Sequence, residues 1–195
     1  MEKLVIASNN AGKLREFQHM LAPLGIEVLT QSQLGISEAE EPHCTFIENA
    51  LAKARHVSQA CGLPSLADDS GICVEALGGA PGVFSARYAG EPKSDRRNND
   101  KLLQAMQGVI DRRAHYYCVL VLVRHADDPQ PLIAEGEWYG EIAHEERGDG
   151  GFGYDPMFWL PEFGKMSSEL TRDEKAQFSH RAKALKVLLA KLKIR

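Results

Sequence analysis

The sequence lacks the features that mark a membrane or secreted protein. Its longest apolar run, Cys118 to Val123, is too short to span a bilayer. The first residues enter a strand-like run without the charged leader and apolar core of a signal peptide. Only four cysteines occur, with no C-x-x-C pair, which argues against a disulfide framework or a zinc site and favours reduced thiols. We therefore expect a cytoplasmic protein without a membrane partner.

An excess of positive charge is also absent, since a net charge of -4 argues against a general nucleic-acid binder. The charge is uneven: residues 171–195 hold eight Lys and Arg against two acids, which gives this tail +6 and the remainder -10. Most of these basic residues are typical of a solvated helix face. The alternative is that one or two of them face an anionic ligand. The 195 residues allow one domain or two lobes around one core.

Strand and helix patterns alternate along the chain. Apolar runs predict strands over 4–7, 26–30, 65–67, 72–74, 116–123 and 133–142, and apolar stripes predict helices over 13–24, 46–60, 94–107 and 181–192. Capping boxes begin at Thr45 and Thr171. Residues 116–123 are long enough for the sheet centre, and 133–142 alternate as a paired antiparallel strand does. This order predicts an α/β fold with a mixed sheet, with a site in the groove where loops converge.

A polar turn follows the first predicted strand, in the stretch IASNNAGKLREF from Ile6 to Phe17. Strand, Gly-Lys turn and helix are the layout of a phosphate-binding loop, yet the P-loop pattern fails. Ala7 stands in place of the first glycine, and Leu14 replaces the Ser or Thr that would hold magnesium. The helix N-terminus and the Lys13 ammonium favour an anion. The alternative is a capped turn with Lys13 in water.

Two adjacent acids, Asp68 and Asp69, stand where an apolar strand is predicted to break off. Unpaired acids near a core are costly, so either they face solvent in a turn or they hold a cation. Magnesium takes oxygen ligands and usually only one or two carboxylates. The acidic loop at Glu40 and Glu41 could supply the second.

A glycine-rich loop, Gly148 to Pro156, matches G-x-G-x-x-G formally. The dinucleotide interpretation is rejected, because Pro156 and the aromatic pair Phe158-Trp159 argue against the helix that it needs. The loop would instead present Phe152 and Tyr154 beside Asp155, which suits stacking on a nucleobase. The alternative is that both rings are packed into the core.

A basic group lies at the junction of two predicted C-terminal helices, where Lys175 precedes Ser179-His180-Arg181. His180 and Arg181 fall in the first turn of the last helix, where the helix dipole disfavours a cation. They therefore indicate an anion or carbonyl oxygens as a partner. The alternative is a solvated helix start.

Six motifs in this order resemble the inosine triphosphate pyrophosphatase family, whose bacterial members are XTP/dITP diphosphatases. They are SNNxxK at 8–13, TFxENA at 45–50, ADDSG at 67–71, GGxPG at 78–82, GFGYDP at 151–156 and SHR at 179–181. The resemblance implies one domain over 1–195, with an elongated mixed sheet and flanking helices that form two lobes around a central nucleotide-binding cleft. It also implies a homodimer that needs Mg²⁺ and hydrolyses ITP, dITP and XTP to the monophosphate and pyrophosphate, which cleanses the nucleotide pool.

The same resemblance assigns roles to residues. Asp69 is the general base and a metal ligand, and Glu40, favoured over Glu41, is the other metal ligand. The residues that hold the phosphates are Ser8, Asn9, Asn10, Ala11, Gly12 and Lys13. The residues that line the nucleotide site are Ser70, Phe152, Gly153, Tyr154, Asp155, Lys175, His180 and Arg181. Lys175 and Arg181 are the candidate donors to the purine C6 carbonyl, which would disfavour the amino group of ATP.

Two other functions stay open. One is a hydrolase for modified pyrimidine or standard nucleotides. The other is a non-catalytic nucleotide-binding module, which the acids Asp68 and Asp69 argue against, because a pure anion binder gains nothing from them.

Overall fold

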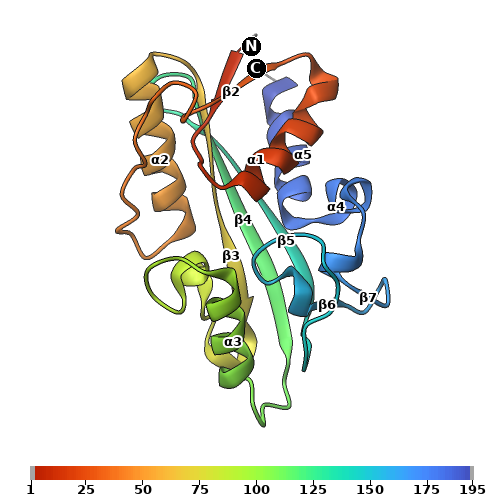
Figure 1. Cartoon of the computed structure of the whole chain (residues 1–195). Coiled ribbons are helices and arrows are strands. Elements are labelled where there is room, and N and C mark those ends of the chain that lie inside the picture. Colours follow the sequence, from red (N-terminus) through yellow and green to blue (C-terminus); the bar gives the residue numbers. More distant parts are fainter. Residues whose placement is uncertain (1–2, 194–195) are drawn as a thin grey trace. The chain divides into compact units, whose positions relative to one another are not determined.

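A computed structural model describes residues 3–193, which contain one mixed sheet with helices beside it (Figure 1). The strand order is β2-β1-β3-β4-β5-β6-β7. The strands are β1 Lys3–Ile6, β2 Glu27–Thr30, β3 Ser65–Val74, β4 Arg113–Val123, β5 Leu132–Ile142, β6 Phe158–Leu160 and β7 Lys165–Met166. β1 pairs parallel with β2 and β3, whereas β6 pairs antiparallel with β5 and β7. The predicted α/β fold with a mixed sheet is therefore confirmed, with β4 at its centre as expected.

Five α-helices and five short 3-10 helices complete the described chain. The α-helices are α1 Ala11–Leu21, α2 Phe46–Cys61, α3 Asp95–Ala105, α4 Arg172–Phe178 and α5 His180–Lys193. The 3-10 helices are η1 Ala22–Leu24, η2 Glu75–Leu77, η3 Gly82–Arg87, η4 Asp155–Met157 and η5 Ser167–Glu169. Within residues 3–193, none of the helices has the length and apolar character needed to cross a membrane.

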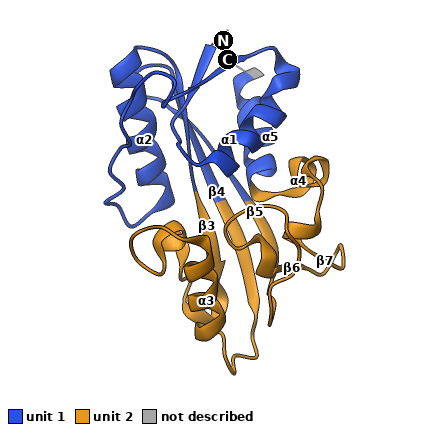
Figure 2. Cartoon of the chain, viewed as in Figure 1, with its two compact units in different colours: residues 1–69, 118–136, 181–195 blue, residues 70–117, 137–180 orange. Residues whose placement is uncertain are grey.

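Two compact units divide the chain (Figure 2). Unit 1 comprises residues 3–69, 118–136 and 181–193 of the described chain, and unit 2 comprises residues 70–117 and 137–180. Each unit has a hydrophobic core of its own. The predictions of a single domain over 1–195 and of a central cleft stay predictions.

Unit 1 packs α1 and α5 on one side of its strands and α2 on the other (Figure 1). The apolar stripe predicted over 181–192 is confirmed, because Leu185 and Leu188 are buried in the core and the partly buried Leu189 and Leu192 pack against it. α1 begins at Ala11, two residues before the predicted start, because the Asn10 side chain caps it by accepting from the Lys13 N–H at 3.0 Å. Pro23 then falls in η1, where a missing backbone N–H costs little.

Unit 2 packs its core around aromatic side chains. Tyr116 and Trp138 each meet Phe158 edge to face, with ring centroids 4.7 and 5.8 Å apart. α3 turns an unusually polar face inward, since Asn98 and Asn99 are buried beside Leu102. The capping box predicted at Thr171 is confirmed at the start of α4.

The break predicted in the chain at Asp68–Gly71 is wrong, because β3 runs through it without interruption. Two buried acids within a strand are tolerated because each has cationic partners in unit 1, as the contacts below show. Neighbouring residues of a strand point to opposite faces of the sheet. Asp68 therefore faces α1 and α5, and Asp69 faces α2.

Candidate active site

Asp68 is the centre of a buried ionic cluster in unit 1. Its Oδ1 accepts a hydrogen bond from the Lys13 ammonium, and its Oδ2 accepts from Arg181 Nε at 2.9 Å and from the Cys118 thiol at 3.1 Å. Arg181 also donates to Glu16. Burial acts to raise the pKa of Asp68, but the charges of Arg181 and Lys13 outweigh it and hold the pKa well below its usual range. Asp68 is therefore an ionised anchor for two of the predicted substrate-binding cations.

The predicted phosphate-binding residues lie together at the start of α1. Within this turn, the Asn10 N–H donates to Ser8 Oγ at 3.1 Å, in addition to the cap that Asn10 provides. Asn9, Asn10 and Ala11 are exposed, and Gly12 is buried. The turn is thus ordered by its own side chains and open to a ligand, and its binding of phosphate stays a prediction.

Asp69 belongs to a second cluster in unit 1, which is centred on Lys53 of α2. Lys53 Nζ donates to Asp69 Oδ1 at 2.8 Å and to Glu41 Oε1 at 2.6 Å. Burial acts to lower the pKa of Lys53, but the two carboxylates outweigh it and raise the pKa above its usual value. Burial raises the pKa of Asp69, while Lys53 and Lys13 oppose the rise. Lys53 therefore stays an ammonium that holds one oxygen of Asp69.

The second oxygen of Asp69 is the feature that fits a metal. Asp69 Oδ2 is buried and has no hydrogen-bond partner among residues 3–193. A buried carboxylate oxygen without a partner is costly, and a Mg²⁺ ion with its waters would satisfy it. In the described part of the chain, no group of three or more His, Cys, Asp or Glu could hold a metal ion. This position therefore suits an ion that takes most of its ligands from water and substrate.

The choice between Glu40 and Glu41 gains a structural argument. Glu41 is partly buried and shares Lys53 with Asp69, whereas Glu40 is exposed. The geometry favours Glu41 as the second carboxylate, and the earlier preference for Glu40 stays untested.

Lys53 is a functional candidate that the motifs did not indicate. A signal for it was present in the sequence, because Asn49, Lys53 and Val57 are spaced four residues apart along α2 and both flanking residues are buried. A lysine on the inward stripe of a helix needs an anionic partner. That partner could not be named from the sequence, because Asp69 lies in a different element.

In unit 2, Asp155 organises the glycine-rich loop. Its Oδ2 accepts from the Phe152 N–H at 2.9 Å and from Lys175 Nζ at 2.6 Å, and its Oδ1 accepts from Ser167 Oγ at 2.8 Å. Lys175 Nζ also lies 5.8 Å from the centre of the half-buried Phe152 ring. The structure therefore brings together three of the predicted nucleotide-binding residues, namely Phe152, Asp155 and Lys175.

Two other predicted residues of unit 2 are buried in its aromatic core. The Tyr154 hydroxyl donates to the Ser85 carbonyl at 2.8 Å, and burial raises the pKa of this phenol. The His180 ring stacks on Tyr116, with centroids 4.7 Å apart and planes 9° apart. Of the two rings expected on the loop, Tyr154 anchors it, which leaves Phe152 as the candidate for stacking. Ser70 is half-buried and directly follows Asp69 in β3.

Comparison with known proteins gives matches along the whole fold. Residues 4–191 match the Ham1 family. A dITP/XTP pyrophosphatase of Nitrosomonas europaea is 67% identical over 192 residues, which cover 98% of this chain and 95% of the relative. A dITP/XTP pyrophosphatase of Ralstonia nicotianae is 63% identical over 197 residues, which cover 100% of this chain and 98% of the relative.

Solved structures agree with these matches. A HAM1 protein of Coxiella burnetii has a TM-score of 0.91 and 45% identity, with 100% of both chains covered. The Ham1 protein of Staphylococcus aureus has a TM-score of 0.86 and 40% identity, with 98% of both chains covered.

Proposed function

Because this chain belongs to the Ham1 family, we propose that it hydrolyses the non-standard purine nucleotides ITP, dITP and XTP to the nucleoside monophosphate and pyrophosphate. The family predicted from the six sequence motifs is thereby confirmed. The names of the relatives, dITP/XTP pyrophosphatases, support hydrolysis of this nucleotide class.

A single structural observation carries the proposal: the buried Asp69 has one oxygen held by Lys53 and the other without a partner in residues 3–193. In the proposed reaction, the Asp69 carboxylate takes the proton of a water that attacks the α-phosphorus. The bond from the water oxygen to phosphorus forms, and the bond from phosphorus to the bridging oxygen breaks. Pyrophosphate then leaves as a whole.

The cations and the acids of unit 1 are proposed to stabilise the charges that change during the reaction. The Lys13 ammonium and the turn before it stabilise the charge that develops on the pyrophosphate leaving group. The Lys13 ammonium also pairs with Asp68, and this ion pair fixes it beside the start of α1. Asp69 and Glu41 would hold a Mg²⁺ ion, which would neutralise charge at the reacting phosphate.

Base recognition is assigned to unit 2. Phe152 offers a ring on which a purine stacks, and Lys175 beside it donates to the C6 carbonyl that hypoxanthine and xanthine share. Arg181 is the weaker donor candidate, because its side chain is 1% exposed and donates to two carboxylates, whereas the Lys175 side chain is 11% exposed and donates to Asp155. Adenine carries a donor at C6, so ATP is the disfavoured substrate.

The deciding experiment measures which products the purified protein releases from ITP, dITP, XTP and ATP, with Mg²⁺ or with EDTA. We expect pyrophosphate from the first three, dependence on Mg²⁺ and a low rate with ATP. Release of single phosphates, or preference for a standard or pyrimidine nucleotide, would indicate a different hydrolase. Binding of ITP without turnover would indicate a nucleotide-binding module.

The quaternary structure and location are part of the same proposal. We expect a homodimer of two 21.5 kDa chains, which light scattering would measure as about twice the chain mass. An enzyme that acts on free nucleotides fits a cytoplasmic location.

A further inference from the structure

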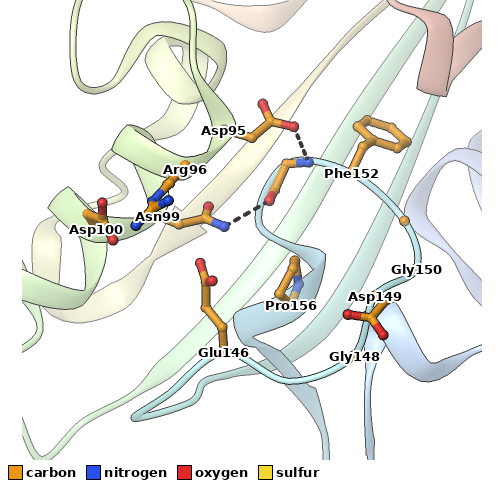
Figure 3. A pocket seen from close by; sticks show the side chains of 12 residues that line it. Asp95, Arg96, Asn99, Asp100, Glu146, Gly148, Asp149, Gly150, Phe152 and Pro156 are labelled. Atoms are coloured by element: carbon orange, nitrogen blue, oxygen red, sulfur yellow. Dashed lines mark hydrogen bonds between the residues drawn. The ribbon is translucent and has the colours of Figure 1, made fainter.

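Two side chains of α3 hold both backbone groups of one residue in the glycine-rich loop. Asp95 Oδ2 accepts from the Gly153 N–H at 2.8 Å, and Asn99 Nδ2 donates to the Gly153 carbonyl at 3.1 Å (Figure 3). Asp95 and Asn99 are four residues apart, so they lie on one face of the helix. The carboxylate and the amide together clamp Gly153 against α3.

The loop has few other means of fixing this point. Residues 148–153 read GDGGFG, and glycine gives the backbone more conformational freedom than any other residue. Gly153 itself has a φ of +61°, and nothing lies within 4 Å of where its Cβ would be. Packing around a side chain therefore cannot hold this residue, and hydrogen bonds to its backbone must do so.

The residue between the anchors is Phe152. Its own N–H donates to Asp155 at 2.9 Å, and the next N–H, of Gly153, donates to Asp95. Two consecutive peptide groups are thus fixed by carboxylates from different elements. In Figure 3 the Phe152 ring points away from Asn99 and Asp100. The clamp therefore holds the backbone next to Phe152 and does not contact the ring.

A cavity of about 470 Å³ borders the loop on the side of α3 (Figure 3). Its lining residues are Asp95, Arg96, Asn99, Asp100, Glu146, Gly148, Asp149, Gly150, Gly151, Phe152, Gly153 and Pro156. Four carboxylates against one guanidinium would repel a triphosphate, so the cavity is no second nucleotide site. It does leave the loop room to move toward α3 when the clamp is removed.

Asn99 has a buried polar atom that is unfavourable for stability, which suggests that the residue serves a function other than stability. Its Oδ1 is buried without a hydrogen-bond partner in residues 3–193, although its amide group is used on Gly153. An unsatisfied buried acceptor destabilises the fold. The neighbouring Asn98 differs, because its Oδ1 accepts from the Ala89 N–H at 2.7 Å and its amide donates to the Ala86 carbonyl at 3.1 Å.

We propose that Asp95 and Asn99 are positioning residues for base recognition, which set the affinity and selectivity of the site through the backbone of Gly153 and hence the ring of Phe152. This inference rests on the proposed function of the chain. Neither residue touches the base, and both act through the loop.

The test compares Asp95→Ala, Asn99→Ala and the control Asn98→Ala in steady-state kinetics with ITP and ATP, together with melting temperature. For the two clamp variants we expect KM for ITP to rise about fivefold or more, with a smaller change in kcat and a narrower ITP/ATP ratio of kcat/KM. Asp95→Asn keeps an oxygen acceptor for the Gly153 N–H and should restore part of the loss. Asn98→Ala should lower the melting temperature and leave KM and the ratio within about twofold of wild type.

A second readout follows the loop itself. Hydrogen exchange of residues 148–154 should become faster in Asp95→Ala and Asn99→Ala and stay unchanged in Asn98→Ala. If folded clamp variants keep the wild-type KM, ratio and exchange rate, the positioning role is wrong. A change in stability alone, with KM and the ratio unchanged, would also overturn it. Wild-type protein that releases no pyrophosphate from ITP would instead overturn the proposed function, so the two failures are distinguishable.

Discussion

Lys53 Nζ lies 2.8 Å from Asp69 Oδ1. The proposed base of the reaction, in β3, is therefore held by a lysine of α2, the helix that precedes this strand in the chain. The same ammonium reaches Glu41 at 2.6 Å. One ammonium therefore holds both carboxylates. We expect substitution of Asp69, of Lys53 and of Glu41 to have three different effects on activity.

We expect Asp69→Asn to lower kcat by about 10²-fold or more, because it removes the oxygen that accepts the proton of water. The substitution keeps the size of the side chain, so the melting temperature should stay close to that of wild type. Product release from ITP under saturating Mg²⁺ measures the effect. Near wild-type turnover by the folded variant would rule out Asp69 as the base.

Lys53→Met should also lower kcat strongly, because it leaves the buried Asp69 and the partly buried Glu41 without their shared cation. The loss should be about tenfold or more, since each buried charge-assisted hydrogen bond is worth roughly 1.5–3 kcal/mol. Arg55→Ala is the matched control, because Arg55 is exposed on the same helix. The role assigned to Lys53 fails if the two variants behave alike.

The two neighbouring glutamates are separated by a metal titration. Glu41→Gln should raise the Mg²⁺ concentration needed for half-maximal activity by about tenfold, because it removes one of two charged ligands from the proposed site. Glu40→Gln changes an exposed residue and should leave the titration near that of wild type. The opposite result would assign the metal to Glu40, as the family resemblance implied.

Asp128 gives a stability prediction that does not depend on catalysis. It is buried and accepts from Arg124 Nε at 2.8 Å, from the Arg124 N–H at 3.0 Å and from the Gln130 N–H at 2.9 Å. The Arg124 side chain is the main reason that the pKa of Asp128 lies well below its usual value. A lowered folded-state pKa stabilises the fold above the unfolded pKa of about 4, and this stabilisation is lost as pH falls below it.

Asp128→Asn should therefore lower the melting temperature at pH 7 by about 2–4 °C, the shift that loss of one net hydrogen bond causes in a chain of this size. The difference from wild type should shrink between about pH 5 and pH 2. Asp127→Asn, at an exposed position, should show neither effect. A difference that is constant with pH would exclude the ionised carboxylate as its cause.

Local patterns predicted the elements of this fold well, and they failed where the cause was distant. The central place of β4 followed from its apolar run, and the start of α4 followed from the Thr171 capping box. The continuity of β3 through Asp68 and Asp69 did not, because the cations that compensate these acids come from α1, α2 and α5. Sequence alone does not show that such residues meet.

The site shows the same division. The motifs indicated Asp69 and Phe152, and the basic group at the helix junction indicated Lys175. The choice between Glu40 and Glu41 depends on how one loop orients its side chains. The clamp by Asp95 and Asn99 was missed as well, because its partner is a backbone more than fifty residues further along the chain. A glycine that is held only by its peptide groups leaves no side-chain pattern to detect.

Asp68 and Asp69 point to opposite faces of β3, and this alternation limits where the sequence can accept an insertion or a deletion. Asp68 anchors cations beside α1 and α5, and Asp69 turns to Lys53 on the opposite face. Insertion or deletion of one residue within Ser65–Ala67 would exchange the two faces, because side chains alternate with a period of two. The anchor would then stand in the place of the base, so we expect homologous chains to vary in length in their surface loops and to keep this strand free of gaps.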